Sequence, residues 1–379
     1  MRVAFRSRPD TLAPQMSLFD WACRVGQVSG TTGQAWRFLR PGLYIFNYHR
    51  IGDAESAPFD PNVFSCTTNR FAEHVDLIRS RFNVINVAQL LEAIERGSRS
   101  TDPLAMITFD DGYRDNFTEA LPILRSTGTS AVFFVPTAYI GTNHVPWWDD
   151  VAWSIKHAER EDLGDVPWLR DVVLGPIGTK RISRVLSAFK RSNLSIEVKL
   201  RQLREATGCS LPEVPDRGLF MSWDEVRLLR QAGMDVGSHT HSHRILGHLD
   251  LVEQRAELEM SKRVLETQLG EPIHTLAYPV GKAATYSTDT QEIARSCGYR
   301  AAFTFVAGYN RHPIDNPFEL RRQGVDSNMS AEELRFSTVR VSWGLDNLQV
   351  TAQARHAVRS LMMLIRRTPP AERNQHGGV

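Results

Sequence analysis

Residues 106–113 read MITFDDGY, an apolar run that ends in two adjacent aspartates followed by a glycine. The apolar run predicts a buried strand, and successive side chains of a strand point to opposite faces. Asp110 and Asp111 therefore point in different directions unless the chain bends, and Gly112 permits a bend. Two crowded carboxylates repel, so the pKa of one rises unless a cation lies between them or binds one of them. The pair therefore predicts a metal ion, for which other parts of the chain must supply further ligands.

Strand-like and helix-like segments alternate on both sides of this stretch. Strand-like runs lie at 43–49, 82–86, 105–109, 130–140, 234–239, 274–279 and 299–305. Segments with helical spacing lie at 70–82, 87–97, 115–128, 222–233, 251–270 and 288–298. Alternation of this length predicts an α/β fold with a parallel sheet, and about seven units predict a distorted (β/α) barrel. Polar helical stretches from about 149 to 216 interrupt the rhythm and predict an inserted helical segment.

The two ends of the chain carry no motif. We expect a leader and helix at 1–42, the barrel at 43–330 and a C-terminal extension at 331–379. From about residue 351 the extension has the composition of a basic amphipathic helix. Packing of a terminal helix is the simpler interpretation, and peripheral membrane contact through the termini is the alternative.

The composition narrows the partners and the location. Hydrophobic residues make up 42% of the chain and charged residues 23%, as in an ordinary globular protein. The formal net charge of +2 gives no electrostatic support for a nucleic-acid partner. No stretch approaches the ~18 apolar residues of a transmembrane helix, and the N-terminus lacks the apolar run of a signal peptide. The four cysteines have neither metal-site nor disulfide spacing, so we expect a cytoplasmic protein without a transmembrane segment.

A second polar cluster, GSHTHSH at 237–243, follows another predicted strand. His239 and His243 are four residues apart, which places both imidazoles on one side of a helical turn or of a bend after the strand. One carboxylate and two imidazoles leave room for water, as in a catalytic metal site. Such a set suits zinc, with cobalt, nickel or iron(II) as alternatives. The same histidine spacing occurs on solvated helix faces, but here both motifs follow parallel strands, where α/β active sites gather.

In their order along the chain, ITFDDGY, GSHTHSH and the later LAYPVG (276–281) resemble the motifs of the polysaccharide deacetylase family. These carbohydrate esterases share the NodB homology domain. The resemblance covers roughly residues 43–325 and leaves both ends of the chain unexplained.

The resemblance implies a role for each matching residue. Asp111, His239 and His243 would hold a divalent metal, and Asp110 would be the general base. A metal polarises an acetamide carbonyl and lowers the pKa of bound water, while a neighbouring carboxylate takes the proton. The backbone N–H of Tyr113 is the expected second donor to the tetrahedral oxyanion.

The sequence departs from the better-known family pattern in two places. It has no leucine-x-x-histidine motif near its end, where many members keep an acid histidine. His49 of NYHRI is the candidate acid, as in members resembling the poly-N-acetylglucosamine deacetylases, and a buried, hydrogen-bonded histidine is the alternative. Ala277 stands where the fuller LAYPVG-type motif has an arginine that orients the catalytic aspartate. Arg322 is the candidate replacement.

Three further residues are candidates for shaping the substrate pocket. Pro279 is expected to shape it without taking part in the chemistry. Trp147 and Trp148 of HVPWWDD present aromatic faces that suit stacking on a sugar ring, and packing against the inserted helices explains them equally well.

The sequence therefore predicts a metal-dependent hydrolase that removes an N-acetyl group from an amino sugar in a polysaccharide, oligosaccharide or glycan precursor. The same site would serve an O-acetyl esterase or a hydrolase of small amides. A noncatalytic carbohydrate-binding relative is the alternative from another class, favoured by the absent arginine and the displaced acid. A metalloprotease is disfavoured because HTHSH lacks the glutamate of HExxH.

Overall fold

The structure of the chain is a computed structural model that describes residues 22–23, 26–27, 30–97, 100–210 and 218–344. The described residues up to Trp343 belong to one compact unit. The amphipathic helix predicted from about residue 351 lies outside the described residues. Within the described ranges, no helix is both long enough and apolar enough to span a lipid bilayer.

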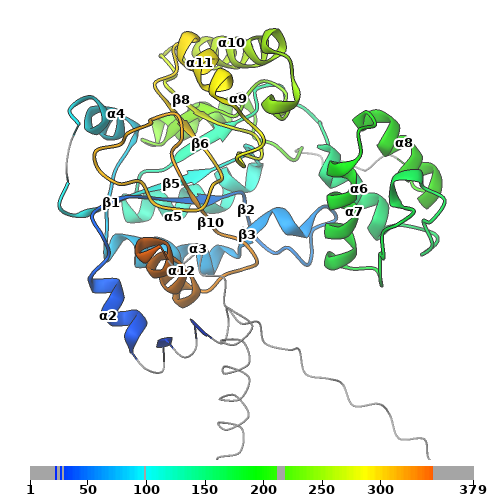
Figure 1. Cartoon of the computed structure of the whole chain (residues 1–379), viewed down its shortest axis with the longest axis horizontal. Helices are drawn as coiled ribbons and strands as arrows, with labels where there is room; N and C mark the ends of the chain where they lie inside the picture. The colour runs from blue at the N-terminus through cyan, green and yellow to red at the C-terminus, as the bar shows by residue number, and fades with distance from the viewer. Residues whose placement is uncertain (1–21, 24–25, 28–29, 98–99, 211–217, 345–379) are drawn as a thin grey trace, which may run out of the picture. The chain divides into compact units, whose positions relative to one another are not determined.

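A curled parallel sheet occupies the centre of this unit (Figure 1). Its strands are β1 (Gly42–Tyr48), β4 (Asn83–Val84), β5 (Pro103–Phe109), β6 (Val132–Val135), β7 (Asp235–Ser238), β8 (Thr275–Ala277), β9 (Ala301–Phe303) and β10 (Gln323–Gly324). Their order is β10-β1-β5-β6-β7-β8-β9, and β4 pairs with β5 outside this path. Leu320, just before β10, pairs with Phe303 of β9, so the sheet curls back toward its first strand. The predicted distorted (β/α) barrel is confirmed.

Helices connect most of the strands. They are α3 (Thr68–Arg79), α4 (Val87–Glu95), α5 (Leu121–Thr127), α9 (Trp223–Gln231), α10 (Leu251–Leu269) and α11 (Thr288–Ser296). Asn86, Ser222 and Asp250 start α4, α9 and α10 with capping boxes. The helix predicted at 115–128 begins instead as a π-helix at Asn116–Ala120. Pro122 follows at the start of α5, where it has no N–H to donate to the preceding turn.

Shorter elements lie over the carboxyl ends of the strands and in the connections. They are the paired strands β2 (Arg50–Ile51) and β3 (Phe64–Cys66), and the 3-10 turns η1 (Pro61–Val63), η3 (Pro167–Leu169) and η4 (Leu246–His248). His49 is the single residue between β1 and β2, so it lies where the chain passes from the large sheet to the small one.

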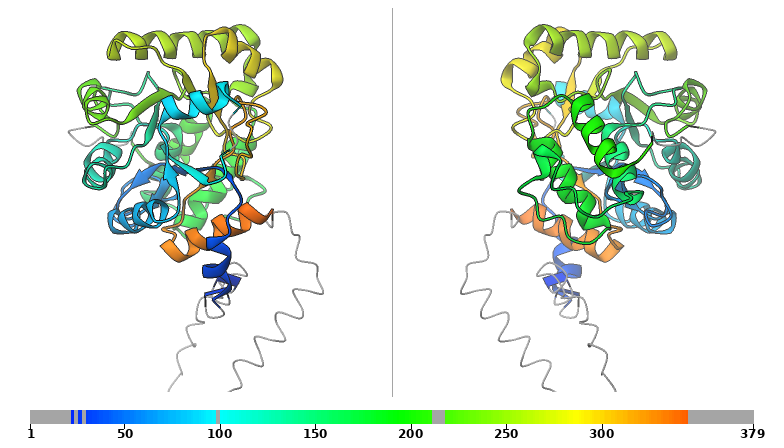
Figure 2. Two further views of the ribbon diagram at one scale, coloured as in Figure 1. Left: turned by 90° about the vertical axis from the view of Figure 1, so that its left-hand side faces the viewer. Right: turned by 90° about the vertical axis from the view of Figure 1, so that its right-hand side faces the viewer.

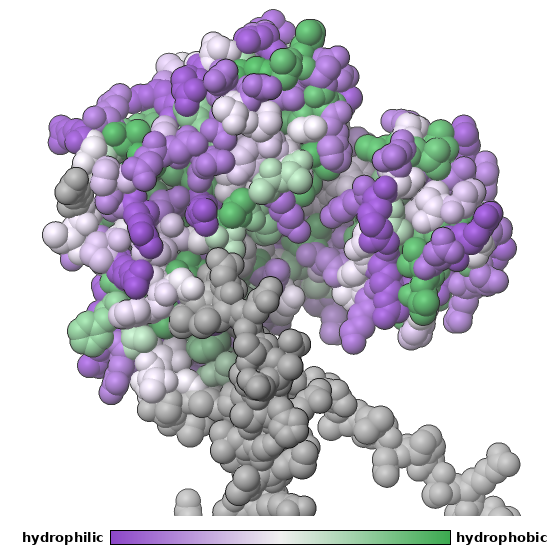
Figure 3. All heavy atoms as spheres, in the orientation of Figure 1, coloured by the Kyte–Doolittle hydropathy of each residue, from purple (hydrophilic) through white to green (hydrophobic). Residues whose placement is uncertain are grey.

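Three helices form the inserted segment beside the sheet: α6 (Trp147–Lys156), α7 (Thr179–Arg191) and α8 (Ile196–Thr207). The ring of Trp147 in α6 stacks on Phe189 of α7 with centroids 4.7 Å apart. Arg204 of α8 forms an ion pair with Asp150 of α6. The surface of these helices is largely hydrophilic on the face shown in Figure 3, and it is hollowed between them and the barrel. The insertion is thus a helical layer with its own packing that stands beside the mouth of the barrel.

The first and last of the longer helices in the described chain pack against each other. Helix α12 (Ala331–Trp343) packs against α2 (Thr31–Arg37) and α3, and α12 and α2 lie side by side in Figure 2. The hydroxyl of Tyr44 in β1 donates a hydrogen bond of 2.7 Å to Ser342 of α12. The compact unit therefore includes the first helix of the segment predicted as the C-terminal extension.

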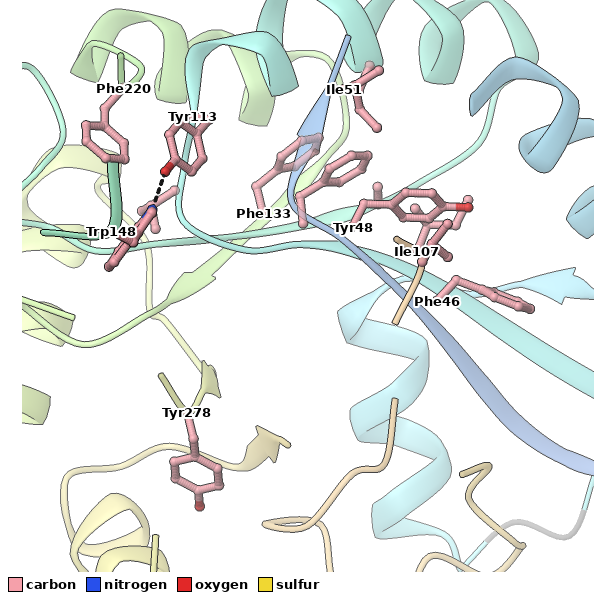
Figure 4. Packing of buried hydrophobic residues seen from close by; sticks show 14 of the residues in the cluster. Phe46, Tyr48, Ile51, Ile107, Tyr113, Phe133, Trp148, Phe220 and Tyr278 are labelled. Carbon is pink, nitrogen blue, oxygen red and sulfur yellow. Dashed lines mark hydrogen bonds between the residues drawn. The ribbon is translucent and has the colours of Figure 1, made fainter. Parts of the chain in front are cut away.

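An aromatic core lies beneath the strand ends (Figure 4). Phe109 of β5 stacks on Phe133 of β6 at 4.7 Å and on Tyr48 of β1 at 5.5 Å. All seven residues of β1 are buried, as expected for a parallel strand covered on both faces. Phe109 directly precedes Asp110 and Tyr48 directly precedes His49, so this packing fixes the carboxyl ends of β5 and β1.

Candidate metal centre and active site

The motifs found in the sequence meet at the carboxyl ends of the parallel strands. Asp110 and Asp111 follow β5, His239 follows β7, and Tyr278 follows β8. They line a cavity of about 250 Å³. Residues from the inserted helices complete its wall, among them Trp148 of α6. The barrel therefore supplies the floor of the cavity, and the insertion supplies one side.

A left-handed bend separates the two aspartates. Asp111 has φ 74° and Gly112 has φ 70°, a conformation that favours glycine. A Cβ at position 112 would lie only 3.0 Å from side-chain atoms of Ile140 and Val135. Glycine is therefore favoured at position 112 on both conformational and steric grounds. The bend sends the Asp110 carboxylate toward Arg322 and the Asp111 carboxylate toward the histidines.

Asp111, His239 and His243 form a compact set of donors. Their ligand atoms all lie within 4.8 Å of one another. Nε2 of His239 lies 3.4 Å and Nε2 of His243 lies 3.2 Å from Oδ1 of Asp111. The loop that places the histidines is not a helical turn, because Thr240 (φ 63°) and His243 (φ 55°) are left-handed. The four-residue spacing thus brings the imidazoles together through a strained loop.

The donor set fits a divalent cation. Ligands about 2.0–2.2 Å from a tetrahedral ion are about 3.3–3.6 Å apart, close to the two separations from Asp111. Nδ1 of His239 lies 2.8 Å from the carbonyl oxygen of Ala277, which can only accept, so this nitrogen carries the proton and Nε2 is left to bind a metal. Burial lowers the pKa of His243, which favours its neutral form. One carboxylate and two imidazoles suit zinc and other late divalent metals.

A buried glutamate on α10 holds the histidine loop. Glu257 accepts hydrogen bonds from the backbone N–H groups of His241 (3.0 Å) and Ser242 (2.8 Å), and from the Ser242 hydroxyl. Nδ1 of His241 lies 2.8 Å from the Thr137 hydroxyl, so this histidine supports the loop. The loop's geometry therefore depends on Glu257, which no motif singled out.

Replacing Glu257 with Ala is expected to weaken metal binding about 10–100-fold, because groups that orient ligands usually contribute this much. Competition with a chromogenic chelator measures the affinity. Glu259→Ala is the matched control, since Glu259 lies on the same helix but is exposed. Equal affinities for the two variants would contradict a role for Glu257 in shaping the site.

Arg322 forms a bidentate ion pair with the carboxylate of Asp110. Its two terminal nitrogens donate to the two oxygens of Asp110 at 2.8 and 2.7 Å, and its Nε donates to the Thr304 carbonyl at 2.6 Å. Both side chains are almost completely buried. Burial alone would raise the pKa of Asp110, but the charge of Arg322 lowers it below its ordinary value. Arg322 is therefore placed to orient Asp110. Ala277, which stands where the fuller motif has an arginine, has no side chain that could do so.

Asn47 is part of the same network and was not found from the sequence. Its amide donates to Asp110 at 3.2 Å, and its carbonyl oxygen accepts from Arg322 and, at 2.7 Å, from the Thr108 hydroxyl. A polar residue inside the apolar run 43–49 was the available signal. Asn47 ties the end of β1 to the end of β5 directly beneath the carboxylate.

His49 lines the cavity two residues beyond Asn47. Its backbone is fixed, because its N–H donates to Ser65 (2.9 Å) and its carbonyl accepts from Asn116 (2.6 Å). Its half-buried ring packs edge-on against Phe305 with centroids 5.9 Å apart, and makes no hydrogen bond within the described part of the chain. The ring is therefore available to a ligand in the cavity.

Trp148 contacts the donor set of Asp111, His239 and His243 from the insertion side. Its ring lies 4.9 Å from that of His243. Its Nε1–H donates to the Tyr113 hydroxyl at 2.7 Å, the bond drawn in Figure 4, and that hydroxyl donates to Asp149 at 3.0 Å. Asp149 also accepts from the backbone N–H of Asp60 at 3.0 Å. This chain of bonds sets the position of Trp148 against His243.

Asp149 is predicted to make the stability of the protein depend on pH. Burial raises its pKa to about 7, far above its value in an unfolded chain. Between about pH 4 and 7 the unfolded state ionises and the folded state does not, so this group makes folding less favourable as pH rises. The stability of Asp149→Asn relative to wild type should therefore increase over this range, by up to about 4 kcal/mol.

Urea unfolding of both proteins from pH 4.5 to 8 measures this difference. Asp171→Asn is the control, because Asp171 is exposed and its replacement should leave the pH dependence unchanged. A constant difference between Asp149→Asn and wild type would show that Asp149 is ionised in the folded protein throughout the range.

Of the remaining candidate residues, only some line the cavity. Among the described residues that line the cavity are Trp147, Tyr278 and Val280, but not Tyr113 or Pro279. Pro279 lies between two lining residues and shapes the chain there. The Tyr113 ring is buried, but its backbone forms a bridge with Phe220 in which the bonds belong to the flanking residues. The Tyr113 N–H is therefore turned away from that partner strand.

Known proteins share parts of this chain. A Bacillus subtilis protein, YxkH, is 21% identical over 70% of this chain and 65% of its own length. The poly-β-1,6-N-acetyl-D-glucosamine N-deacetylase of Escherichia coli K12 is 24% identical over 77% of this chain, and the match covers 38% of that protein. The chain thus spans less than two thirds of these curated relatives.

Solved structures share the fold. The deacetylase PplD of Streptococcus pyogenes, in complex with acetate, superposes with a TM-score of 0.51 at 17% identity, over 79% of this chain and 99% of its own. IcaB from Ammonifex degensii superposes with a TM-score of 0.50 at 18% identity, over 79% of this chain and 98% of its own.

The sequence model of the polysaccharide deacetylases matches residues 97–302, more than half of the chain. The matched region contains both aspartates of ITFDDGY, the histidines of GSHTHSH and the strand of LAYPVG. On this match the chain belongs to the polysaccharide deacetylase family of hydrolases.

Proposed function

We propose that this protein removes the N-acetyl group from an N-acetylglucosamine unit of a polysaccharide, an oligosaccharide or a glycan precursor. The observation that carries the proposal is the position of Asp110, held by Arg322 beside the donor set of Asp111, His239 and His243 at the floor of one cavity. The name of the Escherichia coli relative supports the choice of substrate.

Asp111, His239 and His243 would hold a divalent metal, preferably zinc. When bound there, such an ion polarises the acetamide carbonyl and lowers the pKa of water. The remaining chemistry belongs to the residues of the chain. Asp110 takes a proton as the water oxygen bonds to the carbonyl carbon, and the grip of Arg322 keeps its carboxylate ionised and aimed.

Two further groups complete the reaction. The backbone N–H of Tyr113 donates to the oxyanion that develops on the carbonyl oxygen. The bond between the carbonyl carbon and the sugar nitrogen then breaks, and His49 gives a proton to the leaving amine. Acetate and the free amino sugar are the products. Trp147, Trp148 and Phe305 supply aromatic walls that suit the apolar face of a sugar ring.

Acetate release tests the proposal. The substrates are N-acetylglucosamine oligomers and O-acetylated sugars, assayed with the protein as purified, after chelation, and after zinc is returned. We expect acetate from the N-acetyl substrates, its loss on chelation and its recovery with zinc. Turnover of only the O-acetyl sugars would identify an esterase, and metal binding without turnover of either class would favour a noncatalytic sugar-binding protein.

The cellular setting rests on the sequence alone. The cytoplasmic location, the absence of a nucleic-acid partner and peripheral membrane contact through the termini stay predictions. If the protein acts in the cytoplasm, a glycan precursor is a more accessible substrate than a finished polymer.

A further inference from the structure

Two lysines line the cavity from different parts of the fold. Lys190 lies in the last turn of α7 in the insertion, and Lys282 lies in the loop after β8 of the barrel. Both side chains are exposed, so they stand at the mouth of the cavity. Within the described ranges, neither ammonium group lies within ion-pair distance of a carboxylate. The mouth of the site thus carries two positive charges that form no ion pair among the described residues.

Contacts of the lysines and their neighbours position both residues. Next to Lys190, the ring of Phe189 stacks on Trp147 at 4.7 Å, and the Lys190 ammonium lies 5.8 Å from the centre of the Trp147 ring. The carbonyl of Lys282 accepts two bonds of 2.8 Å from the N–H and hydroxyl of Thr285. These contacts fix where each side chain begins, and both lysines line the cavity.

The carboxylates of the cavity do not neutralise these charges. Asp110 is committed to Arg322, and Asp111 belongs to the metal-ligand set. Asp60 also lines the cavity and attracts Lys190, but it is buried and accepts bonds from the backbone N–H (3.0 Å) and side-chain amide (2.6 Å) of Asn62.

The two lysines also act on each other. Both residues line one cavity, which brings two like charges to one site. Partial desolvation of its ammonium group lowers the pKa of Lys190 although the side chain is exposed, and the positive charge of Lys282 lowers it further. An anion between them would relieve this repulsion, and a positively charged rim raises the local concentration of anionic ligands.

We propose that Lys190 and Lys282 form an anion subsite, so that the substrate carries a negatively charged group beside its N-acetylated sugar. A phosphate ester, as in an activated or lipid-linked glycan precursor, matches two ammonium point charges best, and the carboxylate of a neighbouring uronic acid shares the same chemistry. This inference rests on the proposed function and narrows its substrate class.

Binding tests the subsite independently of turnover. Isothermal titration calorimetry on the metal-loaded full chain compares N-acetylglucosamine, N-acetylglucosamine 1-phosphate, and a disaccharide of N-acetylglucosamine and glucuronic acid. We expect at least one charged ligand to bind about tenfold more tightly than the neutral sugar at low salt, with the gain shrinking as salt is added. Whether the phosphate or the disaccharide shows the gain distinguishes the two anions.

Substitutions distinguish anion binding by the lysines from anion binding by the metal, which also attracts phosphate. The gain should fall in Lys190→Gln and in Lys282→Gln and disappear in the double variant. It should persist in Lys180→Gln, because Lys180 is exposed on the same helix outside the cavity lining. A gain of the same size in the double variant would assign anion binding to the metal and overturn the subsite.

Acetate release distinguishes the subsite from the proposed function. If neutral oligomers are deacetylated but charged ligands bind no more tightly than neutral ones, the subsite fails and the deacetylase stands. If charged ligands bind through the lysines but no N-acetyl group is released, the subsite stands and the proposed reaction fails.

Discussion

Replacement of Asp110 by Asn is expected to lower kcat for acetate release roughly 10²–10⁴-fold, the usual contribution of a general base. The amide preserves the size of the buried side chain but cannot take a proton from the attacking water. Because the metal-ligand set uses Asp111 and not Asp110, the metal content should match that of wild type.

Acetate release at saturating substrate and metal analysis of the same preparation check this expectation. Asn at position 110 also leaves the buried guanidinium of Arg322 without its anion, so circular dichroism and thermal unfolding must accompany the assay. A folded, metal-loaded variant with the kcat of wild type would contradict the assignment of Asp110 as the base.

Replacement of Arg322 by Met is expected to have two large effects. It leaves the buried Asp110 carboxylate without its cation, which typically lowers the free energy of unfolding by about 3–5 kcal/mol. It also raises the pKa of Asp110, because burial then acts without the opposing charge. Since the base must be ionised, the acidic limb of the profile of kcat/KM against pH should move to higher pH.

The lowered pKa of Asp110 also makes the stability of the folded protein depend on pH. The lowered pKa of Asp110 stabilises the folded wild type above the unfolded pKa of the carboxyl, and this contribution is lost as pH falls through the folded pKa. Arg322→Met should lose that contribution, so its deficit against wild type should be largest at neutral pH and shrink in acid.

Urea unfolding and the pH profile measure these effects. Arg321→Met is the matched control, because Arg321 is the neighbouring residue and is exposed. Arg322→Lys keeps the charge but cannot form the two parallel hydrogen bonds, so it allows the test if the Met variant does not fold. Unchanged pH profiles in both Arg322 variants would show that Arg322 does not control the pKa of Asp110.

Most of the fold could be predicted from local patterns. The apolar runs became β1, β5, β6, β8 and β9, because parallel strands covered on both faces are largely apolar along their length. Helical spacing marked α4, α9 and α10 to within a few residues. The π-helix at Asn116–Ala120 was not expected, because no residue pattern in 115–128 marked a change of helix type ahead of Pro122.

The candidate metal donors were the part of the site that the sequence indicated most directly. Acids and histidines that follow parallel strands must gather at one edge of the sheet, whatever the strand order. The residues that hold those donors were not visible in this way. Glu257 and Asn47 belong to helix and strand patterns in which a polar residue is ordinarily solvated or incidental.

The sequence by itself determined the alternation of strands and helices and the kinds of chemical group at the strand ends, because both depend on neighbours in the chain. The tertiary structure alone decided which distant groups meet. Arg322 grips Asp110 because β10 and β5 flank β1, which brings residues 212 positions apart within hydrogen-bond distance. Lys190 and Lys282 line one cavity because the insertion and the barrel both contribute to its wall. Contacts between such distant residues follow from strand order and packing, which produce no repeating pattern in the sequence.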